Sequence, residues 1–175
     1  MFDARLHELK MQEALGPRRV IVRRPTPSDA ASLAMLFSEM QTHYGCPVPD
    51  EKALQAGRLA CKPVATEFDP RVLIAVLDDV IIGSIVLNVT FPAFELSQSL
   101  YIRDLYVSHR IRRSGIGQKL VRAAARLAFQ EGFCALDWTT DTANSAARKM
   151  YESCGANALT RTYYRLTPQD ISSEL

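Results

Sequence analysis

The sequence has no long apolar run, no paired cysteines and almost no net charge, and each absence removes a class of protein. No stretch approaches the roughly 18 consecutive apolar residues of a membrane span, and residues 1–16 carry acidic side chains where a secretory signal would be apolar. We therefore expect a cytoplasmic protein with no membrane partner. A formal charge of +2 over 175 residues provides no overall field to attract nucleic acid, so we expect no nucleic-acid partner.

The four cysteines form no C-x-x-C pair and, with only three histidines in the chain, show none of the spacings of a zinc site. We expect reduced thiols and no bound metal. Cys134 and Cys154 have no histidine close to them in the sequence, so we predict that they are buried packing residues and not catalytic nucleophiles.

The order of apolar patterns predicts one α/β (α+β) domain. Residues 1–16 form an accessory helix or arm that ends at Gly16-Pro17, and residues 17–175 form a single domain. Strands are expected at 18–24, 71–77, 80–91, 99–107, 133–140 and 159–166, and helices at 26–45, 51–59, 114–132 and 142–155. Consecutive strands followed by strand-helix units predict a mixed, mostly antiparallel sheet with helices on both faces.

One segment, His109 to Val121, places two glycines among arginines at the start of a predicted helix. Unpaired N–H groups and the positive dipole end make such a helix start favourable for an anion. Gly115 and Gly117 lack a Cβ, so a phosphate group can approach their backbone closely. No acidic residue stands between Ser108 and Gln130. A solvated basic surface is the alternative, and these residues alone leave both interpretations open.

Two common phosphate-binding patterns do not fit this segment. The sequence G-x-x-x-x-G-K-[ST] is absent, and a dinucleotide fingerprint would need a glycine at the position of Leu120. The glycines therefore do not identify the ligand by themselves.

Two motifs together resemble the GNAT superfamily of N-acetyltransferases. The first is R-x-x-G-x-G at residues 112–117, and the second is N-S-A-A-R-K-M-Y-E-S-C-G-A at residues 144–156. The resemblance covers roughly residues 19–166, and the sequences R-D-L-Y-V and Y-Y-R-L look most like the diamine and polyamine branch. It implies acetyl-CoA as co-substrate, a bulged central strand that splays from its neighbour, and a homodimer that could use the final strands.

The resemblance also assigns roles to individual residues. Backbone groups of one strand would bind the pantetheine arm, the loop before the helix would hold the pyrophosphate mainly through backbone N–H groups, and an asparagine would hydrogen-bond the pantetheine. The cofactor-binding residues implied in this way are Leu105, Tyr106, Val107, Arg112, Arg113, Ser114, Gly115, Ile116, Gly117, Gln118 and Asn144.

Tyr151 is the general acid that the resemblance implies, with its hydroxyl protonating the thiolate of the leaving CoA. Asn144 and Tyr151 are seven residues apart, about two helical turns, and therefore lie on one helix face. A phenol is protonated at neutral pH and can serve as an acid. A core aromatic at Tyr151 and a helix cap at Asn144 are the alternatives.

The acceptor amine must lose a proton before it attacks, and Asp104 is the candidate base. The polyamine branch carries a Glu-Asp pair where this sequence has Arg103 and Asp104. Arg103 replaces an acid with a cation, which weakens the case for a dicationic polyamine. The alternative is that Asp104 has a purely structural role. Three residues near the end of the first predicted helix are further candidates for contact with the acceptor: Glu39, His43 and Tyr44.

These observations predict an acetyl-CoA-dependent N-acetyltransferase that acts on a primary amine of a small molecule by direct attack in a ternary complex. The alternatives are a catalytically silent acyl-CoA-binding or regulatory module, supported by Arg103, and an acetyltransferase that acts on a protein or peptide amine. The hypothesis that the basic loop binds nucleic acid has less support, because the interleaved aromatic residues expected of a protein that binds single strands are missing there.

Overall fold

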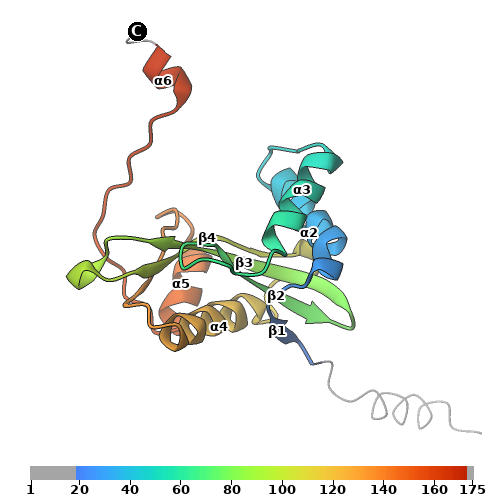
Figure 1. Cartoon of the computed structure of the whole chain (residues 1–175), viewed down its shortest axis with the longest axis horizontal. Helices are drawn as coiled ribbons and strands as arrows, with labels where there is room; N and C mark the ends of the chain where they lie inside the picture. Colours follow the sequence, from blue (N-terminus) through green and yellow to red (C-terminus); the bar gives the residue numbers. More distant parts are fainter. Residues whose placement is uncertain (1–18, 173–175) are drawn as a thin grey trace, which may run out of the picture.

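A five-stranded sheet forms the centre of the computed structural model, which describes residues 19–172 (Figure 1). The predicted arm at residues 1–16 lies outside the described residues. The strands follow one another in the order of the chain, the first four antiparallel and the last parallel to its neighbour. They are β1 (Ile21–Arg23), β2 (Arg71–Leu77), β3 (Val80–Thr90), β4 (Ser99–Val107) and β5 (Leu136–Asp137).

Helices cover both faces of this sheet, as predicted (Figure 1). The α-helices are α2 (Ala30–His43), α3 (Asp50–Ala60), α4 (Ile116–Gln130), α5 (Ser145–Ser153) and α6 (Pro168–Ser172), and three single-turn 3₁₀ helices lie at η1 (Pro27–Asp29), η2 (Phe94–Leu96) and η3 (His109–Ile111). Leu120 and Ala124 of α4 pack into the core on one face, and Leu33 and Phe37 of α2 pack into the core on the other.

The connection between β2 and β3 is the two-residue hairpin that Asp78-Asp79 predicts. Both residues have positive φ, 48° and 62°, which matches the twist of a tight antiparallel turn. Aspartate tolerates this conformation better than most residues because its short side chain can bond locally. The hairpin thereby sets the register of the two central strands.

Strand β4 carries a bulge at Arg103. Val86 of β3 pairs with Asp104 and Leu87 pairs with Ile102, so Arg103 has no partner residue on β3. On its other side β4 pairs with β5 only at Leu100 and Tyr101. Beyond Tyr101 the two strands separate, which is the splayed pair that the family resemblance implies.

The prediction of a closing strand at 159–166 is wrong. This segment is irregular and extends away from the sheet to α6 (Figure 1). A strand exists only where a neighbouring strand pairs with its backbone, and no strand of the described residues does so here. The apolar side chains that favoured a strand are instead exposed, 86% in the case of Tyr164. The strand expected at 133–140 is similarly reduced to the two residues of β5.

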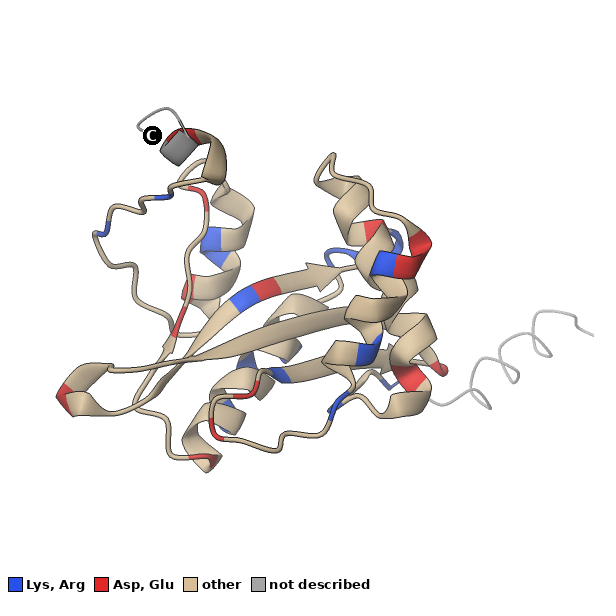
Figure 2. Ribbon diagram, turned by 45° about the horizontal axis from the view of Figure 1, so that its top comes forward, with Lys and Arg blue, Asp and Glu red and all other residues tan. Residues whose placement is uncertain are grey.

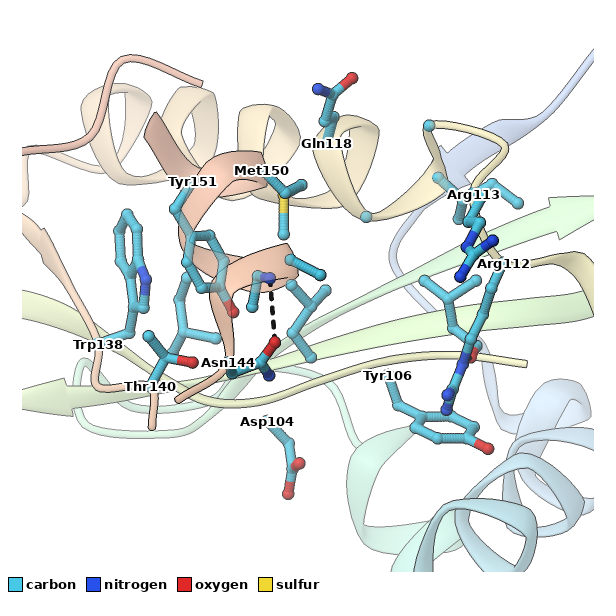
Figure 3. Close-up of a pocket in the computed structure, with 18 of the residues that line it drawn as sticks. Asp104, Tyr106, Arg112, Arg113, Gln118, Trp138, Thr140, Asn144, Met150 and Tyr151 are labelled. Atoms are coloured by element: carbon cyan, nitrogen blue, oxygen red, sulfur yellow. Dashed lines mark hydrogen bonds between the residues drawn. The ribbon is translucent and has the colours of Figure 1, made fainter. Parts of the chain in front are cut away.

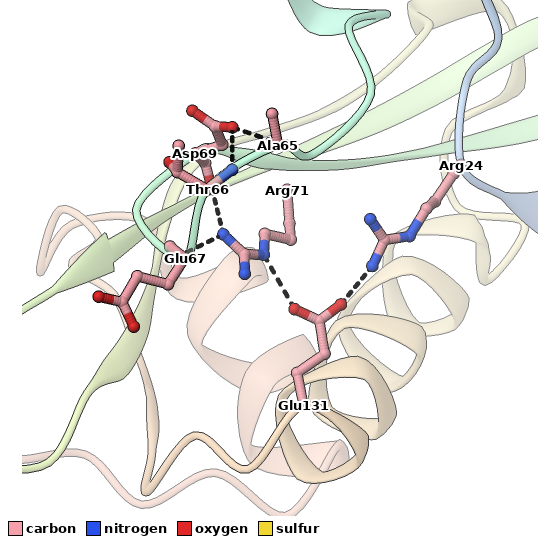
Figure 4. Close-up of polar contacts among 7 residues, drawn as sticks. All are labelled: Arg24, Ala65, Thr66, Glu67, Asp69, Arg71 and Glu131. Carbon is pink, nitrogen blue, oxygen red and sulfur yellow. Dashed lines mark hydrogen bonds and ion pairs between the residues drawn. The ribbon is translucent and has the colours of Figure 1, made fainter.

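Two further local features hold the layers together. Arg71 begins β2 with a buried side chain whose Nε donates to Glu131 Oε2 at 2.9 Å and whose Nη1 donates to the Glu67 carbonyl at 2.8 Å (Figure 4). Arg24 also pairs with Glu131, so the end of α4 is tied to β2 and to the segment after β1.

On the opposite face, Gly57 of α3 lies directly against the backbone of Ala30 in α2.

Cys134 is exposed and Cys154 is half-buried, so the prediction that both are buried is wrong. Cys61, at the end of α3, is the buried thiol. None of the helices between residues 19 and 172 is both long enough and apolar enough to cross a membrane.

Candidate active site

A cavity of about 710 Å³ opens where β4 and β5 separate (Figure 3). Its walls are the second half of β4, the loop before α4, the residues after β5, and one face of α5, with the end of α2 at one side. The sequence-predicted site residues come together here. Those that line it are Asp104, Leu105, Tyr106, Val107, Arg112, Arg113, Ser114, Gly115, Ile116, Gly117, Gln118, Asn144 and Tyr151.

The loop before α4 has positive φ angles at Arg113 and Gly115, a backbone conformation that is common in anion-binding loops. Gly115 is the N-cap of α4 and has φ of 77°, a left-handed conformation that glycine adopts without strain. A Cβ at Gly117 would have Met150 Cε as its nearest neighbour, at 3.7 Å. The protein itself therefore leaves space at Gly117, and this space is part of the cavity.

Two predicted cofactor-binding residues have side chains that point away from the cavity. The Tyr106 ring is buried against α2, and the Ile116 side chain is buried in the core against β3. The Tyr106 backbone pairs with Ser84 of β3, whereas Ile116 begins α4, where backbone N–H groups have no partner within the helix. Leu105 and Val107 likewise pack toward the core under α4. This arrangement agrees with a role for the β4 backbone, since β4 has no partner on this edge beyond Tyr101 among the described residues.

Arg112 is more closely integrated than an exposed loop arginine. Its Nε donates to the Val107 carbonyl at 3.2 Å, and its guanidinium lies 5.4 Å from the centre of the Tyr106 ring. The side chain thus links the loop to the end of β4. Contacts of this kind position the backbone N–H groups of the loop.

Tyr151 lies on the cavity face of α5, with its ring 5.1 Å from that of Trp138 (Figure 3). Burial raises the pKa of its hydroxyl, and the neighbouring Tyr44 and Cys154 raise it further. The group therefore stays protonated through the neutral range. Trp138 was not predicted as a site residue, although it is the single tryptophan of the sequence and stands six residues before Asn144.

Asn144 is the N-cap of α5, because its Oδ1 accepts a hydrogen bond from Ala147 N at 3.1 Å (Figure 3). The capping role considered from sequence is therefore present. The same side chain lines the cavity, and its Nδ2 group is not used by the cap.

Asp104 projects from β4 on the side away from α4 (Figure 3). Burial raises the pKa of its carboxyl, while the charge of Arg103 acts in the opposite direction. Two of the acceptor-side candidates, His43 and Tyr44, line the same end of the cavity. This end therefore combines a half-buried carboxylate with an imidazole and a phenol.

Glu39, the remaining acceptor-side candidate, has a different role. Its carboxylate accepts hydrogen bonds from Tyr106 Oη at 2.9 Å, from Ser108 Oγ at 3.1 Å and from both the backbone and the ring of His109. Burial raises the pKa of Glu39, but these hydrogen bonds lower it to about 2. Such a group is a poor base at neutral pH. It instead ties α2 to the end of β4 and to the start of the loop before α4.

A link between the two motif helices was missed from the sequence. Gln118 of α4 donates through Nε2 to Ser153 Oγ of α5 at 2.7 Å, so the two helices that border the cavity are joined by a hydrogen bond. Within the described range, no group of three or more His, Cys, Asp or Glu side chains is arranged to hold a metal ion.

Comparisons with known proteins agree with this geometry. Residues 33–156 match the model of the acetyltransferase (GNAT) family. An uncharacterized N-acetyltransferase of Bacillus subtilis (strain 168), YhfO, is 30% identical over 134 residues, which cover 77% of this chain and 87% of that protein. The D-amino-acid N-acetyltransferase HPA3 of Saccharomyces cerevisiae is 26% identical over 133 residues, which cover 76% of this chain and 82% of that protein.

Among solved structures, the integron cassette protein VCH_CASS6 from the mobile metagenome of V. cholerae has a TM-score of 0.73 and 28% identity, covering 91% of this chain and 98% of that one. The match to the family model spans more than half of the chain and contains both motifs and the splayed strand pair. The chain therefore belongs to the GNAT family of N-acetyltransferases.

Proposed function

We propose that this protein transfers the acetyl group of acetyl-CoA to a primary amine of a small molecule by direct attack in a ternary complex. The observation that carries the proposal is the single cavity in which the glycine loop, the unpaired edge of β4 and the Tyr151 hydroxyl meet. The GNAT family uses acetyl-CoA, and this cavity offers groups suited to each part of that molecule.

The residues fit acetyl-CoA at both ends. The turn at Gly115 and the Cβ-free surface of Gly117 allow a diphosphate to approach the N–H groups at the start of α4. The edge of β4 from Leu105 to Val107, with which no described strand pairs, can hydrogen-bond the amide groups of the pantetheine arm, and its Val107 carbonyl also accepts a hydrogen bond from Arg112. Acetyl-CoA supplies the acetyl group when bound, as a thioester whose carbonyl these backbone groups can polarise.

Two side chains would move protons. Tyr151 Oη donates a proton to the departing thiolate sulfur, and its raised pKa keeps the phenol protonated until that step. Asp104 accepts a proton from the acceptor amine, directly or through water, and its raised pKa makes it a stronger base than an ordinary aspartate. No covalent intermediate on the protein is required.

Release of free thiol from acetyl-CoA, measured with a panel of primary amines, tests this function. Turnover with small amines supports it. Saturable binding of acetyl-CoA without turnover on any small amine or peptide amine would instead support a silent acyl-CoA-binding module. Turnover of peptide amines alone would contradict the small-molecule part of the proposal.

We also propose that the protein forms a homodimer through residues 159–166. This segment exposes four large apolar or aromatic side chains, Leu159, Tyr163, Tyr164 and Leu166. An extended segment of this composition is suited to pairing with a sheet edge of a second copy. Light scattering during size-exclusion chromatography should give twice the chain mass, and Tyr164→Asp should shift the protein toward monomer. A monomeric wild type would contradict the proposal.

A further inference from the structure

The bulge in β4 places a cation and an anion beside each other on one side of the strand. Ile102 and Leu105 both pack into the core under α4. In a regular strand, residues three apart face opposite sides, so the extra residue at the bulge changes the alternation. The two residues between them, Arg103 and Asp104, both line the cavity and follow each other on β4. Figure 2 shows a basic and an acidic position next to each other on a strand of the sheet.

The charges of these two groups act on each other, and they also act on two tyrosines, Arg103 on Tyr163 and Asp104 on Tyr44. The Arg103 guanidinium is exposed and makes no hydrogen bond or ion pair with another described side chain, and the Asp104 carboxylate makes none either. Arg112, by contrast, is held by the Val107 carbonyl and the Tyr106 ring. Arg103 is therefore a cation at the acceptor end that remains available for an anionic group of a ligand.

The geometry points to an amino acid as the acceptor, with its carboxylate bound by Arg103 and its amine at Asp104. This inference rests on the proposed function and specifies its substrate class. A zwitterion matches two opposite charges on adjacent residues, whereas a diamine would bring a second cation toward Arg103. A guanidinium also binds a carboxylate through two parallel hydrogen bonds, which provides orientation as well as attraction.

Asp104 is half-buried at its place on β4. Burial raises the pKa of its carboxyl, so this end of the cavity is partly shielded from water. A contact between the acceptor amine and Asp104 is therefore less weakened by salt than a contact on an open surface, whereas the contact with the exposed Arg103 is more sensitive to salt. Among the relatives, HPA3 of Saccharomyces cerevisiae is named as a D-amino-acid N-acetyltransferase, which agrees with an amino-acid acceptor without fixing the side chain or the handedness.

The test compares each amino acid with the amine that remains when its carboxylate is removed. Suitable pairs are lysine with cadaverine, ornithine with putrescine, and phenylalanine with 2-phenylethylamine, each assayed by thiol release from acetyl-CoA. We expect kcat/KM of the wild type to favour at least one amino acid over its amine by about tenfold or more, the size of one charge-assisted contact.

Arg103→Met should remove this preference, mainly through a higher KM for the amino acid, and leave kcat/KM for the matched amine unchanged or higher. Arg103→Lys retains the charge and should restore part of the preference. Arg126→Met is the matched control, because Arg126 is exposed on α4 and lies outside the cavity. It should behave like the wild type.

Amines that are turned over as well as their amino acids would overturn this inference while leaving the proposed function intact. An equal loss of kcat/KM for both members of a pair in Arg103→Met would also overturn it, because the arginine would then serve the cavity as a whole. Failure of every acceptor to support thiol release would overturn the proposed function and this inference with it.

Discussion

Two helical glycines, Gly57 and Gly117, should respond in opposite ways to the same change to alanine. A Cβ built on Gly57 would stand 2.3 Å from the Ala30 carbonyl oxygen and 3.1 Å from Ala34 N. Helices α2 and α3 would have to separate by roughly 1 Å to restore ordinary contact. Alanine is the better helix former by about 1 kcal/mol, but overpacking typically costs about 1–3 kcal/mol, so the two effects oppose each other.

Because the atoms in conflict are backbone atoms of a neighbouring helix, which cannot rotate away, we expect the clash to dominate. Gly57→Ala should lower the free energy of unfolding by about 1–2 kcal/mol. For a chain of this size that corresponds to a decrease in Tm of roughly 2–8 °C, measurable by circular dichroism at pH 7. A variant as stable as the wild type would refute the close crossing of α2 and α3.

Gly117→Ala serves as the matched comparison. The nearest atom to its new Cβ would be Met150 Cε at 3.7 Å, an ordinary contact, so Tm should be unchanged or slightly higher. The methyl group would occupy the cavity where the diphosphate approaches the backbone. Affinity for CoA, measured by calorimetry, should fall by about tenfold or more, equivalent to roughly 1.4 kcal/mol. Unchanged affinity would show that the diphosphate does not bind at this turn.

Three further changes test other parts of the account. Arg71→Met should lower stability by about 2–4 kcal/mol in urea unfolding, because Glu131 and a backbone carbonyl lose a buried charged donor; a smaller loss than in Arg24→Met would contradict this. Despite burial, hydrogen bonds lower the pKa of Glu39 to about 2, so its contribution to stability is present above the ordinary carboxyl pKa and disappears as pH falls toward 2. Glu39→Gln should lack that acid-dependent loss and show a raised KM for acetyl-CoA, and a variant with both properties unchanged would refute the positioning role. Asp104→Asn should reduce kcat by about 10²–10⁴. Burial raises the pKa of Asp104, so its negative charge opposes folding at neutral pH. Asp104→Asn should therefore be at least as stable as the wild type at pH 7. This advantage should disappear below the pKa that the aspartate has in the unfolded chain. Full activity would exclude Asp104 as the base.

Local patterns in the sequence were sufficient for much of the fold. Apolar runs identified β2, β3 and β4, and the Asp78-Asp79 pair identified the hairpin between the first two. The glycine loop and the motif around Tyr151 located the cavity, because each signal depends on residues only a few positions apart.

Features that depend on distant partners could not be predicted. The family resemblance implied a bulged central strand, but the position of the bulge at Arg103 depends on the pairing with β3. The role of Glu39 depends on His109, which is 70 residues away. Residues 159–166 have the composition of a strand, but a strand also needs a neighbour, and composition cannot provide one.

The central claim is that Tyr151 protonates the leaving thiolate during direct acetyl transfer. Tyr151→Phe removes only the hydroxyl and keeps the ring against Trp138, so the cavity should remain intact. We predict that kcat for thiol release falls by about 10²–10⁴ while the Kd for acetyl-CoA stays within a few fold of the wild-type value. Wild-type kcat in Tyr151→Phe at every pH between 6 and 10 would contradict the account.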